Sequence, residues 1–151
     1  MQGELVKQWA HRQVQRNIVL LVRDIDDGAV CVVELGVPLP DCSIRCQRTG
    51  QFSKRMNAHA IRMDLVVVFQ NDTLCIVEVD GPRGNSQREI KAREQYIRES
   101  LGIEVPICRV KFHVKQEWLG KVHDTTDAEQ AVVFEKEDIT RKLKRVRAGR
   151  M

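Results

Sequence analysis

Residues 62–82 read RMDLVVVFQNDTLCIVEVDGP and place three carboxylates in one of the most apolar stretches of the chain. Two runs, Leu65 to Phe69 and Leu74 to Val79, are rich in Val, Ile and Leu, and the polar residues 70–73 join them. This pattern predicts a β-hairpin that is buried on both faces. Acidic side chains are rarely buried in such a hairpin without a partner, so this segment is the first candidate for a functional site.

The three acids, Asp64, Glu78 and Asp80, are expected to lie close together. Side chains alternate faces along a strand, so Glu78 and Asp80 share one face, and a three-residue turn at 70–72 sets Asp64 directly across from Glu78. Cross-strand neighbours lie about 5 Å apart, where ionised acids raise one another's pKa unless a cation holds them together. A divalent metal ion does this most simply. The alternative is that the acids form structural ion pairs with nearby arginines, namely Arg62, Arg83 or Arg93.

An acid on one strand, an acidic cluster near the end of the next strand and a following helix resemble the PD-(D/E)xK nuclease superfamily. Glu78-Val79-Asp80-Gly81 is similar to the ExDG form of the motif in relatives of the very-short-patch-repair endonucleases. The segment 91–105, KAREQYIRESLGIEV, is similar to their post-motif helix and its glycine-terminated exit into a strand. The resemblance covers about residues 60–112. It implies an α/β fold with a restriction-endonuclease-like core, in which helices flank a central mixed β-sheet in the order αβββαβ.

The resemblance also implies a metal-dependent endonuclease that hydrolyses phosphodiester bonds of nucleic acid, most simply DNA. Asp64 and Glu78 are the expected ligands of Mg²⁺, with Mn²⁺ as a substitute, and Asp80 is a third ligand or holds a metal-bound water. Family members often carry a further Glu on the first helix, which Glu4 or, less closely, Glu34 matches. The alternative function is that of a catalytically inactive nuclease-fold module for nucleic-acid binding or assembly.

Many superfamily members place a Lys two residues after the motif acid, and here that position holds Asp80. The missing positive charge is therefore assigned to the following helix, where Lys91 or Arg93 would stabilise charge in the transition state. Lys91 is favoured because an ammonium group is a compact charge, and Arg93 would instead hold Glu78 or Asp80 in place. Gln87 and Arg88 are weaker candidates for the same role.

Charge and composition favour a nucleic-acid partner. The 151 residues are 42% hydrophobic with a formal net charge of +4, and we divide them into a nuclease-like α/β domain, 1–120, and a charged helical extension with a basic tail, 121–151. Low aromatic content favours duplex DNA over single strands. Two basic segments are expected to contact phosphates, although each could be an ordinary solvated stretch. They contain Arg45, Arg48, Lys54 and Arg55 in the loop 42–60, and Arg141, Lys142, Lys144, Arg145 and Arg147 in the tail.

The remaining elements follow from periodicity and capping signals. A helix is expected over 4–15, followed by a hairpin around Asp26-Asp27-Gly28, unless the first helix extends through Val22. Ser86 with Glu89 predicts a capping box at the start of the second helix, and Gly102 its end. A strand over 103–114 and a charged helix over 136–146 complete the pattern.

Nothing in the sequence indicates a membrane or an oxidising compartment. No apolar run approaches the length of a membrane span, and the first residues lack the pattern of a secretory signal. Five cysteines, an odd number, argue against a disulfide framework, and Cys31, Cys75 and Cys108 are predicted to lie in the core. A cytoplasmic protein is expected. A homodimer is possible, although no coiled-coil pattern is present.

Overall fold

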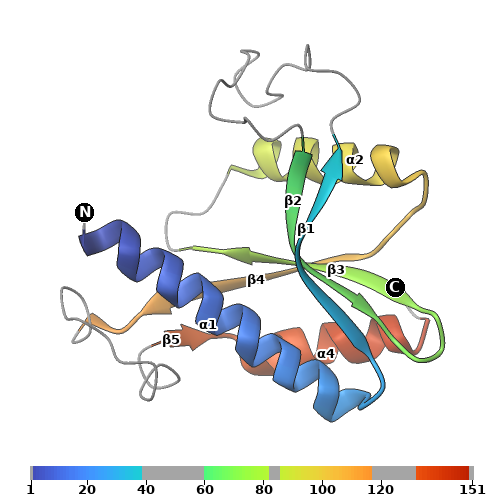
Figure 1. Cartoon of the computed structure of the whole chain (residues 1–151), viewed down its shortest axis with the longest axis horizontal. Helices are drawn as coiled ribbons and strands as arrows, with labels where there is room; N and C mark the ends of the chain where they lie inside the picture. The colour runs from blue at the N-terminus through green and yellow to red at the C-terminus, as the bar shows by residue number, and fades with distance from the viewer. Residues whose placement is uncertain (1, 39–59, 82–85, 117–131, 150–151) are drawn as a thin grey trace.

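The computed structural model describes residues 2–38, 60–81, 86–116 and 132–149. In these ranges the chain forms an α/β fold, in which three helices flank a five-stranded mixed sheet (Figure 1). The elements are α1 (Gln2–Ile25), β1 (Val30–Pro38), β2 (Ala60–Val68), β3 (Leu74–Asp80), α2 (Gln87–Leu101), β4 (Ile107–Val114), β5 (Val132–Phe134) and α4 (Lys136–Arg147). The first six follow the predicted succession αβββαβ.

The strand order is β1-β2-β3-β4-β5, with β3 and β4 parallel and the other neighbours antiparallel. The β2–β3 hairpin pairs Leu65 with Val77. The same register, continued by one residue, sets Asp64 across from Glu78, as the turn length predicted. The parallel pairing of β3 with β4 could not be read from local sequence, and it brings Arg109 beside Glu78.

The first helix is longer than its principal prediction. It runs to Ile25, so the predicted hairpin around residues 26–28 is wrong and the alternative, a helix extending through Val22, is confirmed. Val14, Ile18 and Val22 recur at helical spacing and are fully buried, so the helix gains more from burying this face than a short strand would. Asp26 then forms the turn into β1, because its carboxylate accepts hydrogen bonds from the backbone N–H groups of Gly28 and Gln70.

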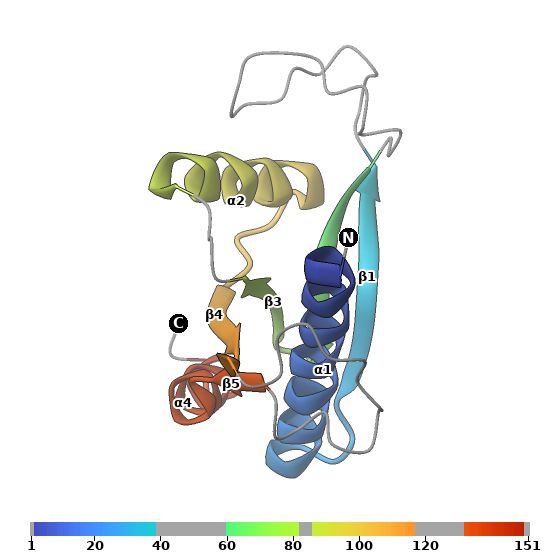
Figure 2. The ribbon, with the colours of Figure 1, turned by 90° about the vertical axis from the view of Figure 1, so that its left-hand side faces the viewer.

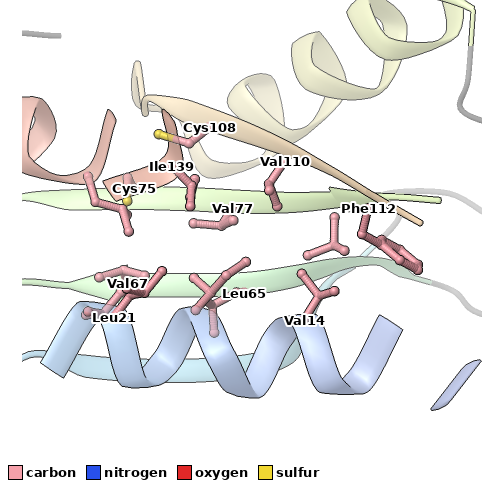
Figure 3. Close-up of a cluster of buried hydrophobic side chains, with 14 of the residues drawn as sticks. Val14, Leu21, Leu65, Val67, Cys75, Val77, Cys108, Val110, Phe112 and Ile139 are labelled. Carbon is pink, nitrogen blue, oxygen red and sulfur yellow. The ribbon is translucent and has the colours of Figure 1, made fainter. Parts of the chain in front are cut away.

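Two apolar clusters cover the two faces of the sheet. The larger one packs α1 and α4 against β2, β3 and β4, as Figures 2 and 3 show, and it includes the buried Cys75 and Cys108. The smaller one packs α2 against the other face, through Ile97 on Ile76 and Val66. Glu78 follows Ile76 by two residues and therefore also lies on the α2 face.

The predicted start and end of α2 are confirmed. The Ser86 side chain accepts a hydrogen bond from the Glu89 N–H, and Gly102 ends α2 with a left-handed φ of 69°. β4 is shorter than the predicted strand over 103–114, because it begins at Ile107. The predicted C-terminal helix is present as α4. It packs on the core, since Ile139, Leu143 and Val146 are buried in the larger cluster.

Several predictions fall outside the described residues. These are the basic loop with Arg45, Arg48, Lys54 and Arg55, the side chain of Glu4, and the proposed domain boundary at residue 120. No helix in the described part of the chain is long and apolar enough to cross a membrane.

Candidate functional site

The site is built where the β2–β3 ladder ends. Regular pairing stops at Leu65 and Val77, and one residue further the Asp64 side chain takes over as acceptor: its Oδ2 lies 2.8 Å from the backbone nitrogen of Val79. This bond holds the carboxylate between the two strands in a fixed orientation. The other oxygen of Asp64 remains available to groups outside the sheet.

Asp64 and Glu78 form a carboxyl pair, as their positions in the hairpin predicted. Burial, followed by a hydrogen bond with Asp64, raises the pKa of Glu78 to about 8. Burial also acts to raise the pKa of Asp64, but hydrogen bonds with His11, Glu78 and the Val79 N–H outweigh it and the net shift is downward. The two carboxyls therefore differ in environment: the pKa of Glu78 is raised and that of Asp64 is lowered.

α1 adds a histidine to this pair. His11 Nε2 lies 3.3 Å from Asp64 Oδ1, and the hydrogen bond with Asp64 raises the pKa of His11 although burial lowers it. One helical turn later, Gln15 Nε2 donates to Glu34 Oε1 and to the backbone oxygen of Asp64, both at 3.0 Å. The helix thus connects β1 and β2 through two polar side chains on an otherwise apolar face.

Glu34 comes from the edge strand β1, where it lies across from Asp64 between the pairs Val33–Leu65 and Leu35–Met63. Its φ is 58°, in the left-handed region that side chains other than glycine rarely adopt. Such a residue costs about 1 kcal/mol or more, and the surrounding strand pairs hold it there. The result is a carboxylate placed beside His11 and Asp64.

His11, Glu34 and Asp64 could hold a metal ion. One donor atom from each lies within 4.8 Å of the others, and Asp64 and Glu34 supply carboxylate oxygens while His11 supplies an imidazole nitrogen. This donor set fits a divalent cation: carboxylates suit Mg²⁺ and Mn²⁺, and the imidazole favours transition metals. The predicted ligand Asp64 belongs to this cluster, and the predicted ligand Glu78 hydrogen-bonds to it.

Asp80 has a different environment. Arg109 donates to both of its carboxylate oxygens, at 2.9 and 2.8 Å, and also to Glu94 on α2 at 3.2 Å. A bidentate pair of this kind is strong and directional. Asp80 is therefore held as an ion-pair partner, which is the alternative that the sequence left open, although the arginine is one that the sequence did not indicate. Its role as a metal ligand stays a prediction.

The two cations assigned to α2 are placed differently. Arg93 Nε lies 3.2 Å from Glu78 Oε1, the holding role considered for it. Lys91 is exposed and forms no ion pair within the described residues. Register instead places Lys111 of β4 next to Asp80 on the same face of the sheet. Lys111 is thus a second candidate for the missing motif lysine.

The basic residues of α4 divide into engaged and free groups. Asp138 pairs with Arg141 and, at 2.9 Å, with Lys142, whose Nζ also donates to the Arg109 backbone oxygen. Arg147 lies 3.6 Å from Asp26. Lys144 and Arg145 are exposed. Hollows at the junction of α1 and α4 are lined in part by Asp24, Ile25 and Lys144, and none of the site acids lines them.

His11, Gln15, Arg109 and Glu94 were missed by the sequence reasoning, and Glu34 was only a second choice. One signal was present: His11 and Gln15 are four residues apart and interrupt the apolar face of α1, which Val14 and Ile18 continue. Polar side chains at that spacing indicate a partner on the sheet. No local signal pointed to Arg109.

The chain was compared with models of known protein families, with curated proteins and with solved structures, and none of the three comparisons found a match.

Proposed function

We propose that the chain is a metal-dependent endonuclease with a restriction-endonuclease-like core of the PD-(D/E)xK type. The observation that carries this proposal is the convergence of donor atoms from His11, Glu34 and Asp64, with Glu78 across from Asp64 in the β2–β3 register. These four residues come from one helix and three strands. Three metal-binding side chains with a fourth carboxyl beside them at the end of a strand ladder are an unusual arrangement for purely structural residues.

Each polar residue of the site has a role in this reaction. His11, Glu34 and Asp64 would hold the cation, which supplies charge neutralisation at the phosphate and acidifies water in its coordination sphere. Gln15 orients Glu34, and the Val79 N–H orients Asp64. Arg93 fixes Glu78 beside Asp64. These contacts hold the carboxylates in place before substrate arrives, which reduces the cost of reorganisation during hydrolysis.

The alternative is a nuclease-fold binding or assembly module without catalysis. Arg109 and Arg93 favour it, because they partner Asp80 and Glu78 and allow the fold to hold these two buried acids without a metal. Asp64 has only His11 as a cationic ion-pair partner in the described part of the chain. The two functions therefore differ in one requirement, which is whether Asp64 needs a divalent cation.

A cleavage assay separates the two functions. The chain is incubated with supercoiled, linear, branched and single-stranded DNA and with RNA, with Mg²⁺, with Mn²⁺ or with EDTA. Asp64→Asn removes the proposed ligand, and Asp72→Asn is the matched control, because Asp72 is exposed in the hairpin turn at a φ of 68° that Asn also adopts. Metal-dependent cleavage that is lost in Asp64→Asn and kept in Asp72→Asn supports the nuclease. Binding without cleavage under every condition supports the module.

A further inference from the structure

Three exposed arginines form a row along α1. At 100° per residue, Arg12, Arg16 and Arg23 fall within about 40° of one another around the helix and span about 16 Å along it. All three side chains are exposed. The row is therefore a straight, rigid line of positive charge on a helix whose opposite side is packed in the core.

The row starts beside the metal-binding cluster. Arg12 and Arg16 directly follow His11 and Gln15, the two residues that contact Asp64 and Glu34. Around the helix, the buried arc ends at Gln15, which is 3% exposed, and Arg12 is the next exposed side chain, about 60° further round. His11 and Asp64 are partly exposed and Glu34 is exposed, so solvent-borne groups next to Arg12 and Arg16 can approach the cluster.

The charges of the row are not neutralised by the fold. Arg12 and Arg16 form no ion pair within the described residues. In contrast, Arg93 and Arg109 form ion pairs with acids, and Arg141 and Lys142 of α4 both pair with Asp138. Unmatched guanidinium groups suit phosphate, which they bind in a planar, bidentate manner. Among the described residues beside the His11–Glu34–Asp64 cluster, the guanidinium groups without an ion pair are therefore those of Arg12 and Arg16 on α1.

We propose that Arg12, Arg16 and Arg23 form a phosphate track for the backbone of a double-stranded nucleic acid and direct it to the His11–Glu34–Asp64 cluster. The proposal rests on the proposed nuclease function, whose substrate path it defines. A straight row on a rigid helix matches the regular backbone of a duplex. Single strands are held largely by stacking on aromatic side chains, and none of the described aromatic residues is exposed. The contacts carry no sequence information, so binding is independent of base sequence.

The test compares two double variants with the same loss of charge. Arg12→Gln/Arg16→Gln removes the two arginines beside the cluster. Lys115→Gln/Lys136→Gln removes two exposed lysines that have no place in the site. Binding to a labelled DNA duplex, to the RNA duplex of the same sequence and to each single strand is measured by fluorescence anisotropy over a range of salt concentrations. EDTA is present throughout, so cleavage does not contribute.

For the arginine variant, we expect duplex affinity to fall roughly tenfold or more at low salt. The slope of log K against log salt concentration should decrease in magnitude by about 1.8, since each of the two lost phosphate contacts contributes about 0.9. The lysine variant should change much less, and both should keep the wild-type thermal midpoint. The DNA and RNA arms identify which duplex is preferred. Equal losses in both variants, or an unchanged slope in the arginine variant, overturn the track, and an equal loss for single strands overturns the duplex assignment.

The outcome is separable from that of the proposed function. If the track exists but the chain is no nuclease, the arginine variant binds more weakly while the wild type fails to cleave with any metal. If the chain is a nuclease without this track, the wild type cleaves and the arginine variant binds as before. A wild-type chain that binds an acidic polypeptide as tightly as a duplex assigns the row to a protein partner and refutes the proposal.

Discussion

Replacing Glu78 by Gln should remove most of the pH dependence of stability in the metal-free protein. The pKa of Glu78 rises from 4.5 to about 8 on folding, with burial as the largest cause and the hydrogen bond with Asp64 next. Between these values the folded chain keeps the Glu78 proton while the unfolded chain has lost it. The free energy of unfolding of the wild type must therefore fall as pH rises through this window.

The size of the effect follows from the shift. From pH 5.5 to pH 9, the folded chain retains the proton over about 2.5 pH units, and at 1.36 kcal/mol per unit the loss is about 3 kcal/mol. For a chain of this length, that corresponds to a fall in Tm of about 6–12 °C. Gln resembles the neutral form of Glu78 and does not titrate. The variant should already be about 1.4 kcal/mol more stable than the wild type at pH 5.5, which lies one unit above the unfolded pKa, and the gap should widen by about 3 kcal/mol at pH 9.

Two neighbours of Glu78 also titrate. The pKa of His11 is raised by its hydrogen bond with Asp64, so its contribution is present below pH 6.5 and is lost as pH rises through the folded pKa, which leaves a residual slope in the variant. The pKa of Asp64 is lowered by its hydrogen bonds despite burial, so its contribution is lost only below about pH 3.8. The positive charges of Arg93 and Arg109 lower the pKa of Glu78 without reversing its shift.

The assay is urea denaturation followed by circular dichroism at pH 5.5, 7 and 9 in EDTA. Glu99→Gln is the control, because Glu99 is exposed on α2 and should leave the wild-type pH profile unchanged. The reasoning is refuted if the wild type gains stability between pH 5.5 and 9, or if Glu78→Gln keeps the full wild-type slope.

Further predictions concern the metal and the surrounding cations. Mg²⁺ and Mn²⁺ should each raise Tm, with Mn²⁺ binding more tightly because of the imidazole ligand. At a metal concentration of 100 times Kd, the free energy of unfolding should rise by about 2.7 kcal/mol, and a similar rise in Asp64→Ala would place the metal elsewhere. In the cleavage assay, Lys111→Ala should lower kcat about 10²-fold and Lys91→Ala much less. The reverse order would show that Lys91 of α2 replaces the missing motif lysine. Arg109→Met should cost about 3–5 kcal/mol in urea denaturation because it leaves Asp80 buried without a partner, and a cost below 1 kcal/mol would show that the pair is not structural.

The sequence by itself determined most of the elements and half of the site. The apolar runs of 65–69 and 74–79 and the short polar link between them define the hairpin and its register, so the pairing of Asp64 with Glu78 followed from counting residues. Ser86 and Gly102 fixed the ends of α2 because helix caps depend on local hydrogen bonds and backbone conformation. These features depend on neighbouring residues, and a sequence reports neighbours directly.

Tertiary structure decided which distant residues join that pair. His11 lies 53 positions before Asp64 in the chain, and their contact depends on how α1 packs on the sheet. Arg109 reaches Asp80 only because β4 runs parallel to β3 in one particular register, and Glu34 joins the cluster through a left-handed residue within a strand. Packing selects such contacts from many that the sequence allows, since the energy that holds a strained residue or a buried ion pair comes from the whole core and has no local pattern.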